Sequence, residues 1–70
     1  MITFSLITRD AGDGEVAIVL YLFRNDEVAS VTTIATVPRS QATMVLIKSR
    51  VHLRRQGVQD ANEAYQRKAG

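Results

Sequence analysis

Cationic side chains gather in one short stretch of the chain, MVLIKSRVHLRRQG, at positions 44–57. Lys48, Arg50 and Arg54 lie at even positions two to four residues apart, and Arg55 follows directly. Arginine and lysine neutralise the phosphates of nucleic acids and form charge-assisted hydrogen bonds with carboxylates. We therefore expect this stretch to bind an anionic partner, either a nucleic acid or an acidic surface of a protein.

Groupings that could carry catalysis or bind a metal are scarce in the sequence. The chain has no cysteine, and its single histidine, His52, stands among cations, as a solvated histidine on a helix face does. Asp60 and Glu63 would share a helical face, where exposed carboxylates pair with nearby basic residues more often than they catalyse. The acids of DAGDGE, residues 10–15, lack the spacing of a calcium loop and fit a hairpin turn. We therefore expect no enzymatic activity, no metal and no cofactor.

Length and composition indicate one domain, which spans residues 1–70. Small domains without disulfides or a metal commonly gain stability by association, because they bury little surface alone. The longest apolar run, residues 16–23, is far shorter than the roughly 20 residues of a membrane-spanning helix. The first residues also lack the pattern of a signal peptide. These properties predict a cytoplasmic protein without a membrane partner.

The net charge of +2 hides a division between the two halves of the chain. Residues 1–38 hold two basic and five acidic side chains, whereas residues 39–70 hold seven basic and two acidic ones. The halves therefore carry −3 and +5, which favours an anionic partner for the second half or pairing between neighbouring subunits. DNA-binding domains built from a three-stranded sheet and a helix typically bind through the sheet, and here the sheet half is acidic.

Three strands are predicted in the first half, over residues 2–8, 15–24 and 28–37. Glycines and an Asn-Asp pair mark the two turns between them, and Pro38 ends the third strand. The middle strand is apolar on both faces, which is typical of a strand with a layer packed on each side. One helix can cover only one face, so Val19, Tyr21 and Phe23 on the other face predict a second partner.

A long helix is predicted over residues 40–67. Residues with 3–4 spacing form one stripe, in which Arg54 is the one charged member: Met44, Ile47, Val51, Arg54, Val58, Ala61 and Tyr65. Gly57 leaves two forms open, because it permits either one bent helix or a first helix that ends at Gln56 and a second over 59–68. The continuing stripe favours the single helix, and we expect this stripe to face the sheet or a partner subunit.

A second apolar line runs along the other side of the predicted helix, through Ala42, Leu46 and Leu53. A helix that is apolar on two sides is usually packed between two layers. At about 40 Å the helix would also overhang strands of about 23–34 Å. With the two-faced middle strand, this predicts a homodimer with a shared core. The residues assigned to that core are Val19, Tyr21, Phe23, Leu46, Leu53 and Tyr65.

The sequence therefore predicts an α+β fold, a three-stranded antiparallel meander followed by one long C-terminal helix, in a homodimer. We expect a protein-binding function, in which Lys48, Arg50, Arg54 and Arg55 contact an acidic or nucleic-acid-binding surface of a host protein. In general type such a chain resembles the small inhibitors that bacteriophages and mobile elements direct at host machinery, anti-CRISPR proteins among them. The alternative is a small DNA- or RNA-binding regulator that uses the same basic helix on phosphates.

Overall fold

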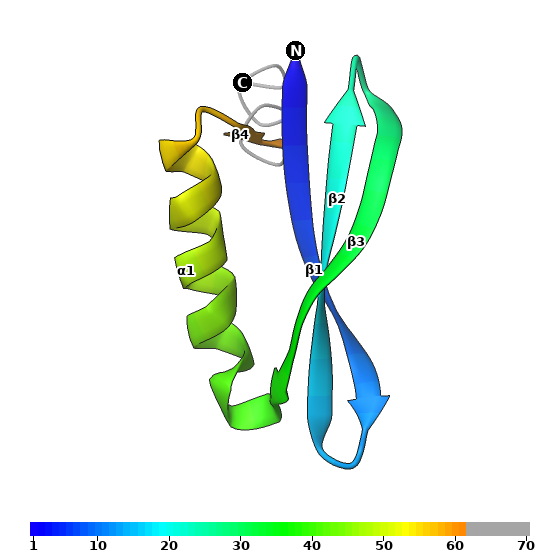
Figure 1. The fold of residues 1–70 in the computed structure, drawn as a ribbon, viewed down its shortest axis with the longest axis vertical. Coiled ribbons are helices and arrows are strands. Elements are labelled where there is room, and N and C mark those ends of the chain that lie inside the picture. The colour runs from blue at the N-terminus through cyan, green and yellow to red at the C-terminus, as the bar shows by residue number, and fades with distance from the viewer. Residues whose placement is uncertain (62–70) are drawn as a thin grey trace, which may run out of the picture.

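A computed structural model describes residues 1–61, which form a mixed four-stranded sheet with one helix on one of its faces (Figure 1). The elements in chain order are β1 (Ile2–Gly12), β2 (Glu15–Arg24), β3 (Glu27–Pro38), a 3₁₀ turn (Arg39–Gln41), α1 (Ala42–Arg55) and β4 (Gln59–Asp60). The strand order is β3-β2-β1-β4; the first three strands form an antiparallel meander, and β4 runs parallel to β1. The predicted α+β fold with a three-stranded meander is confirmed.

Two tight turns connect the strands of the meander, and each uses residues that tolerate left-handed backbone. Asp13 and Gly14 have φ of 52° and 74°, and Asn25 and Asp26 have φ of 53° and 68°. A two-residue turn with positive φ at both positions matches the right-handed twist of the strands that it joins. Because the first turn needs only two residues, β1 continues to Gly12 instead of ending at residue 8 as predicted.

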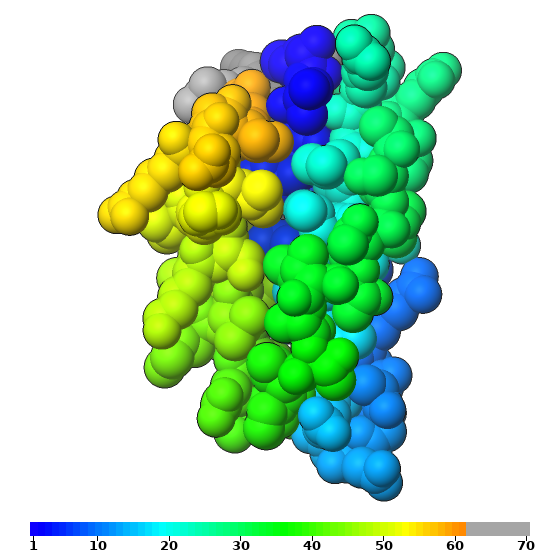
Figure 2. Space-filling model, in the orientation of Figure 1, coloured from blue at the N-terminus to red at the C-terminus, as the bar shows by residue number. Residues whose placement is uncertain are grey.

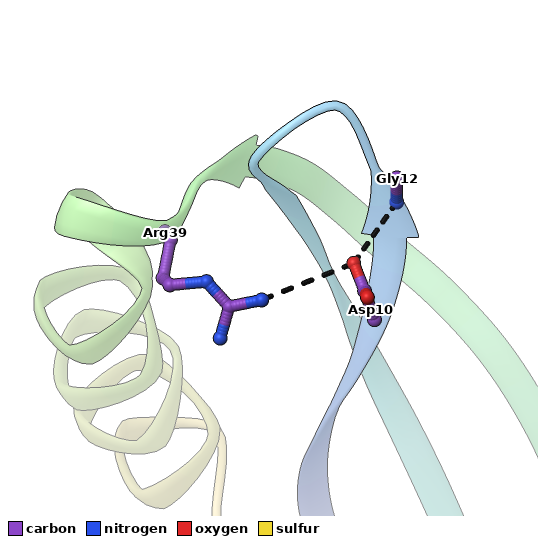
Figure 3. Close-up of polar contacts among 3 residues, drawn as sticks. All are labelled: Asp10, Gly12 and Arg39. Atoms are coloured by element: carbon purple, nitrogen blue, oxygen red, sulfur yellow. Dashed lines mark hydrogen bonds and ion pairs between the residues drawn. The ribbon is translucent and has the colours of Figure 1, made fainter.

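The first hairpin contacts the 3₁₀ turn that precedes α1 (Figure 3). Asp10 Oδ1 accepts a hydrogen bond from the backbone N–H of Gly12 at 3.0 Å and lies 3.9 Å from Arg39 Nη2. The backbone N–H of Arg39 donates to the Gly14 carbonyl at 3.0 Å. The Asp10–Arg39 ion pair is exposed and adds little stability, so the backbone bond is the firmer part of this connection.

A small core lies between α1 and the sheet. Phe4 and Ile18 are fully buried, and Val16 and Ala42 are nearly so. Half-buried residues from both layers pack around Val16, Ile18 and Ala42: Leu6, Ala35, Val37, Val45 and Leu46. β3 is the edge strand beside β2, and its last residues, which lead into the 3₁₀ turn, lie next to the start of α1 (Figure 1).

The helix face that contacts the sheet is the second apolar line of the sequence analysis, through Ala42, Leu46 and Leu53. Ala42 is buried, and Leu46 and Leu53 on the same side are half-buried. The main stripe is instead exposed at three positions: Met44 (59%), Ile47 (54%) and Val51 (41%). Of the two locations predicted for this stripe, the structure excludes the sheet at these three positions, and contact with a partner subunit stays a prediction.

Charge gives a physical reason for this choice of face. The exposed stripe includes Arg54, and packing it on the sheet would require the guanidinium to leave water. The line through Ala42, Leu46 and Leu53 carries no charge, and the small Ala42 side chain lets the helix start close to the strands. The 3₁₀ turn of three residues leaves α1 little freedom to rotate about its axis.

The helix ends at Arg55, so the prediction of one helix over residues 40–67 is also wrong. Gly57 has φ of 85°; its N–H donates to the Arg54 carbonyl, and the Val58 N–H donates to the Leu53 carbonyl. These two bonds form a glycine C-cap that satisfies the last carbonyls and turns the chain away from the helix axis. The alternative end at Gln56 is confirmed.

The shorter helix removes one argument for a second subunit and adds a strand. Fourteen residues span about 21 Å, so α1 does not overhang its own sheet. Beyond the cap, Gln59 and Asp60 pair with Thr3 and Phe4 as β4 instead of continuing a helix. Tyr65, assigned to the core from sequence, lies outside the described residues.

Alanine substitutions of Ile18 and Ile47 test which residues lie in the core and which face of α1 is exposed. Ile18→Ala should lower the free energy of unfolding by about 2–5 kcal/mol, because it opens a cavity in the core. Ile47→Ala, the matched control on the exposed face of α1, should change it by less than about 1 kcal/mol. Urea denaturation followed by circular dichroism measures both, and equal losses would contradict the orientation of α1.

Candidate functional site

The outer face of α1 combines apolar and cationic side chains. Met44, Ile47 and Val51 follow one another along the helix and are each more than 40% exposed. Helical spacing places Lys48 and Arg55 on one side of these residues and Arg54 on the other, and all three cations are exposed. We call these six residues the outer face of α1. An apolar centre with a charged rim is the usual composition of a protein-docking surface.

The charge of α1 is of one sign along its whole length. Ala42–Arg55 contains four cationic side chains and no acidic one. Three of the four residues predicted to contact a partner, Lys48, Arg54 and Arg55, lie on the outer face. Cations in the last turn also interact favourably with the carbonyl end of the helix, so Arg54 and Arg55 stabilise α1 as well.

Arg50 differs from the other three cations, because it contacts the protein's own C-terminal strand. Its Nε atom lies 3.2 Å from Oδ2 of Asp60, and the two side chains are 38% and 7% exposed. Nε is buried, and among the described residues no acceptor meets hydrogen-bond geometry with it, so the contact with Asp60 is a close charge pair without an aligned hydrogen bond. The structure therefore gives Arg50 an internal role beside the partner contact predicted for it.

A shallow groove of about 370 Å³ runs between α1 and β3. Its lining combines apolar side chains from the sheet and the helix with polar side chains of the helix: Leu20, Ile34, Leu53, Lys48, Ser49 and His52. Figure 2 shows this side of the molecule, where atoms of β2 (cyan) are visible between the yellow-green helix and the green β3. The groove adjoins the outer face through Lys48, and the two form one continuous surface.

The second face of the sheet carries the other residues that the sequence assigned to a dimer. Val19 is buried, and Tyr21 and Phe23 are half-buried with their rings stacked at a centroid distance of 6.4 Å. Arg9 donates a hydrogen bond to the Tyr21 hydroxyl at 3.2 Å. Leu46 and Leu53, in contrast, lie on the sheet side of α1, so they serve the protein's own core and its groove.

Sequence reasoning missed the role of Asp60, which it placed on an exposed helix beside Glu63. Asp60 is 6% exposed because β4 holds it against β1 and beneath α1. The signal that could have located it is Gly57, since a glycine that caps a helix forces the next residues to start a new element. Within residues 1–61 no group of three or more acidic or histidine side chains could hold a metal ion.

Two general findings complete the description of the surface. No helix in the part of the chain that the structure describes has the length and apolar character needed to cross a membrane. Comparison of the chain with models of protein families, with curated proteins and with solved structures found no match.

The Arg50–Asp60 pair can be tested with a double-mutant cycle. Arg50→Met and Asp60→Asn should each lower the free energy of unfolding by about 1–3 kcal/mol, less than for a fully buried pair because Arg50 is partly solvated. The double variant should lose at least about 1 kcal/mol less than the sum of the single losses. Urea denaturation measures all three, with Arg55→Met as the control for an exposed cation of α1. Additive losses would show that the two charges do not stabilise each other.

Proposed function

We propose that this chain is a small protein-binding module without catalytic activity, and that it binds an acidic surface of a partner protein through the outer face of α1. The observation that carries the proposal is the exposure of Met44, Ile47 and Val51 in the middle of a cationic helix. Large apolar side chains in a contiguous exposed patch favour contact with another protein, and the surrounding cations favour an acidic one.

The centre of this face favours a protein over a nucleic acid. A surface that binds phosphates places its cations at the points of contact, and one that binds single strands adds aromatic side chains for base stacking. Here the side chains at the centre of the outer face are apolar, and Ala42–Arg55 contains no Phe, Tyr or Trp. The cations lie at the rim, where charges set the rate and specificity of association more than its strength.

In general type the proposed module resembles small inhibitors that mobile elements direct at host machinery, such as anti-CRISPR proteins. A chain of 70 residues without cysteine suits the cytoplasm, where such targets act. We further propose that the chain works as a homodimer. The small core and the apolar side chains exposed on both α1 and β3 support association with itself as well as with a partner.

Two substitutions on the outer face should abolish partner binding without unfolding the protein. Ile47→Asp puts a charge in the apolar centre, and Lys48→Glu reverses the rim; each should weaken binding at least about tenfold. Arg24→Glu makes the same charge reversal at the end of β2 and is the matched control. The measurement is affinity capture from the native host with quantitative mass spectrometry, followed by titration of the purified partner, with circular dichroism to verify the fold.

Two outcomes would contradict the proposal. If Arg24→Glu weakens binding as much as Lys48→Glu, general charge and not this face governs the contact. The second outcome concerns generic duplex DNA in an electrophoretic mobility shift assay. If the chain shifts this DNA at about 50 mM salt, much less at about 200 mM salt, and not at all as Lys48→Glu, the helix binds nucleic acid.

A further inference from the structure

β3 is an edge strand of unusual composition. It is twelve residues long, and within residues 1–61 its backbone pairs with β2 alone. Between Glu27 and Arg39 it contains no charged residue. Val28 and Val31 are 57% and 52% exposed, and Ile34 is also exposed. Proteins usually protect such edges with charged side chains, prolines, bulges or very short strands; here Pro38 ends the strand and two bulges interrupt it, but no charge protects it between Glu27 and Arg39.

One bulge lies on each side of Thr32. The pairing of β3 with β2 skips Ala29, between Val28 and Ser30, and Ile34, between Thr33 and Ala35. The two inserted residues lie three and two positions from Thr32, and Val28 and Thr36 are each four residues from Thr32 with one inserted residue in between. A bulge moves the side chains that follow it by one face, so one bulge on each side leaves Val28 and Thr36 on the same face of the sheet.

We propose that β3 pairs antiparallel with β3 of a second copy of the chain, around a two-fold axis at Thr32. In this register Val31 lies opposite Thr33 of the other copy, and Val28 lies opposite Thr36. Each of these residues pairs with β2 on the face that carries Val19, Tyr21 and Phe23, so like faces meet on both sides of the axis. A register moved by one residue would place residues from the helix-covered face of the sheet opposite residues from its other face, also beyond the bulges.

Charges at the two ends of β3 favour the same antiparallel arrangement. Glu27 begins the strand and Arg39 follows its last residue. The proposed register places Glu27 opposite Val37 of the other copy, at the same end of the strand pair as that copy's Arg39 in the 3₁₀ turn. Antiparallel pairing therefore brings opposite charges to each end, whereas parallel pairing would set like charges side by side.

A second copy fits this edge, because each half of β3 holds one inserted residue and its two ends carry opposite charges. Pairing would extend one continuous sheet through both copies. It would also join the second faces of the two sheets, on which Tyr21 and Phe23 stack within each copy. It leaves α1 in place, because the second copy would pair with the backbone edge of β3, whereas α1 packs on one face of the sheet, where Ala35 and Val37 of β3 also contact the core. The inference uses a different element from the one that carries partner binding, so either can fail without the other.

A single introduced cysteine tests the axis directly, because the chain has none of its own. Opposed residues of antiparallel strands lie about 4.5–5.5 Å apart between Cα atoms, which is within the range of a disulfide. Under mild oxidation Thr32→Cys should form a species of twice the 7.7 kDa chain mass on a non-reducing gel. Thr36→Cys is the matched control on the same strand, and its two copies would be about 20 Å or more apart.

Charge variants at the same position give a second, reversible test. Thr32→Lys or Thr32→Glu alone should raise the dimer dissociation constant about five- to tenfold, because like charges face each other across the axis. An equimolar mixture of the two should restore the dimer, and Thr43→Lys on α1 should leave it unchanged. Analytical ultracentrifugation measures these states, and circular dichroism verifies that each variant is folded.

Three outcomes would overturn the proposal. They are a wild-type chain that sediments as a monomer at about 100 µM, cross-linking of Thr36→Cys as fast as Thr32→Cys, and failure of the mixed charge variants to associate.

Discussion

The ion pair between Arg50 and Asp60 governs how the second half of the chain meets the sheet. It joins the middle of α1 to β4, and β4 in turn pairs with β1, so three elements meet at one contact. A carboxylate that is 7% exposed is costly to bury without a cation nearby, which ties the position of β4 to the orientation of the helix. Once Arg50 points to β4, helical geometry places Met44 and Val51 on the side away from the sheet.

The first half of the fold follows from local sequence signals. Residues 15–24 are apolar on both faces and form the central strand, and the Gly and Asn-Asp positions give the two turns. The second half could not be read in the same way. Both lines of apolar residues on α1 fit helical periodicity, and the choice between them depends on Asp60, ten residues from Arg50 and in another element. Periodicity reports which residues share a face, and it carries no information about which face a distant partner selects.

The candidate site shows the same limit. The cations at 48, 54 and 55 are exposed as their types suggest, but Arg50 has the same type and spacing and is drawn into an internal pair. The apolar side chains that accompany the cations on the outer face were expected in the core. The mixed apolar and cationic character of the outer face could therefore be identified only from the three-dimensional contacts, which show the stripe that α1 leaves exposed.

The two surfaces proposed for association lie on different elements, and this has a consequence for binding. A dimer formed through the β3 edges would leave the outer face of α1 exposed on both copies, since that face points away from the sheet. The dimer would then present two equal cationic faces related by the two-fold axis. A target with two acidic sites at the matching distance would bind both at once, and the second contact would form at a high effective concentration. Two contacts that are each weak, because a helix of fourteen residues offers a small surface, would together give tight and selective binding of the dimer.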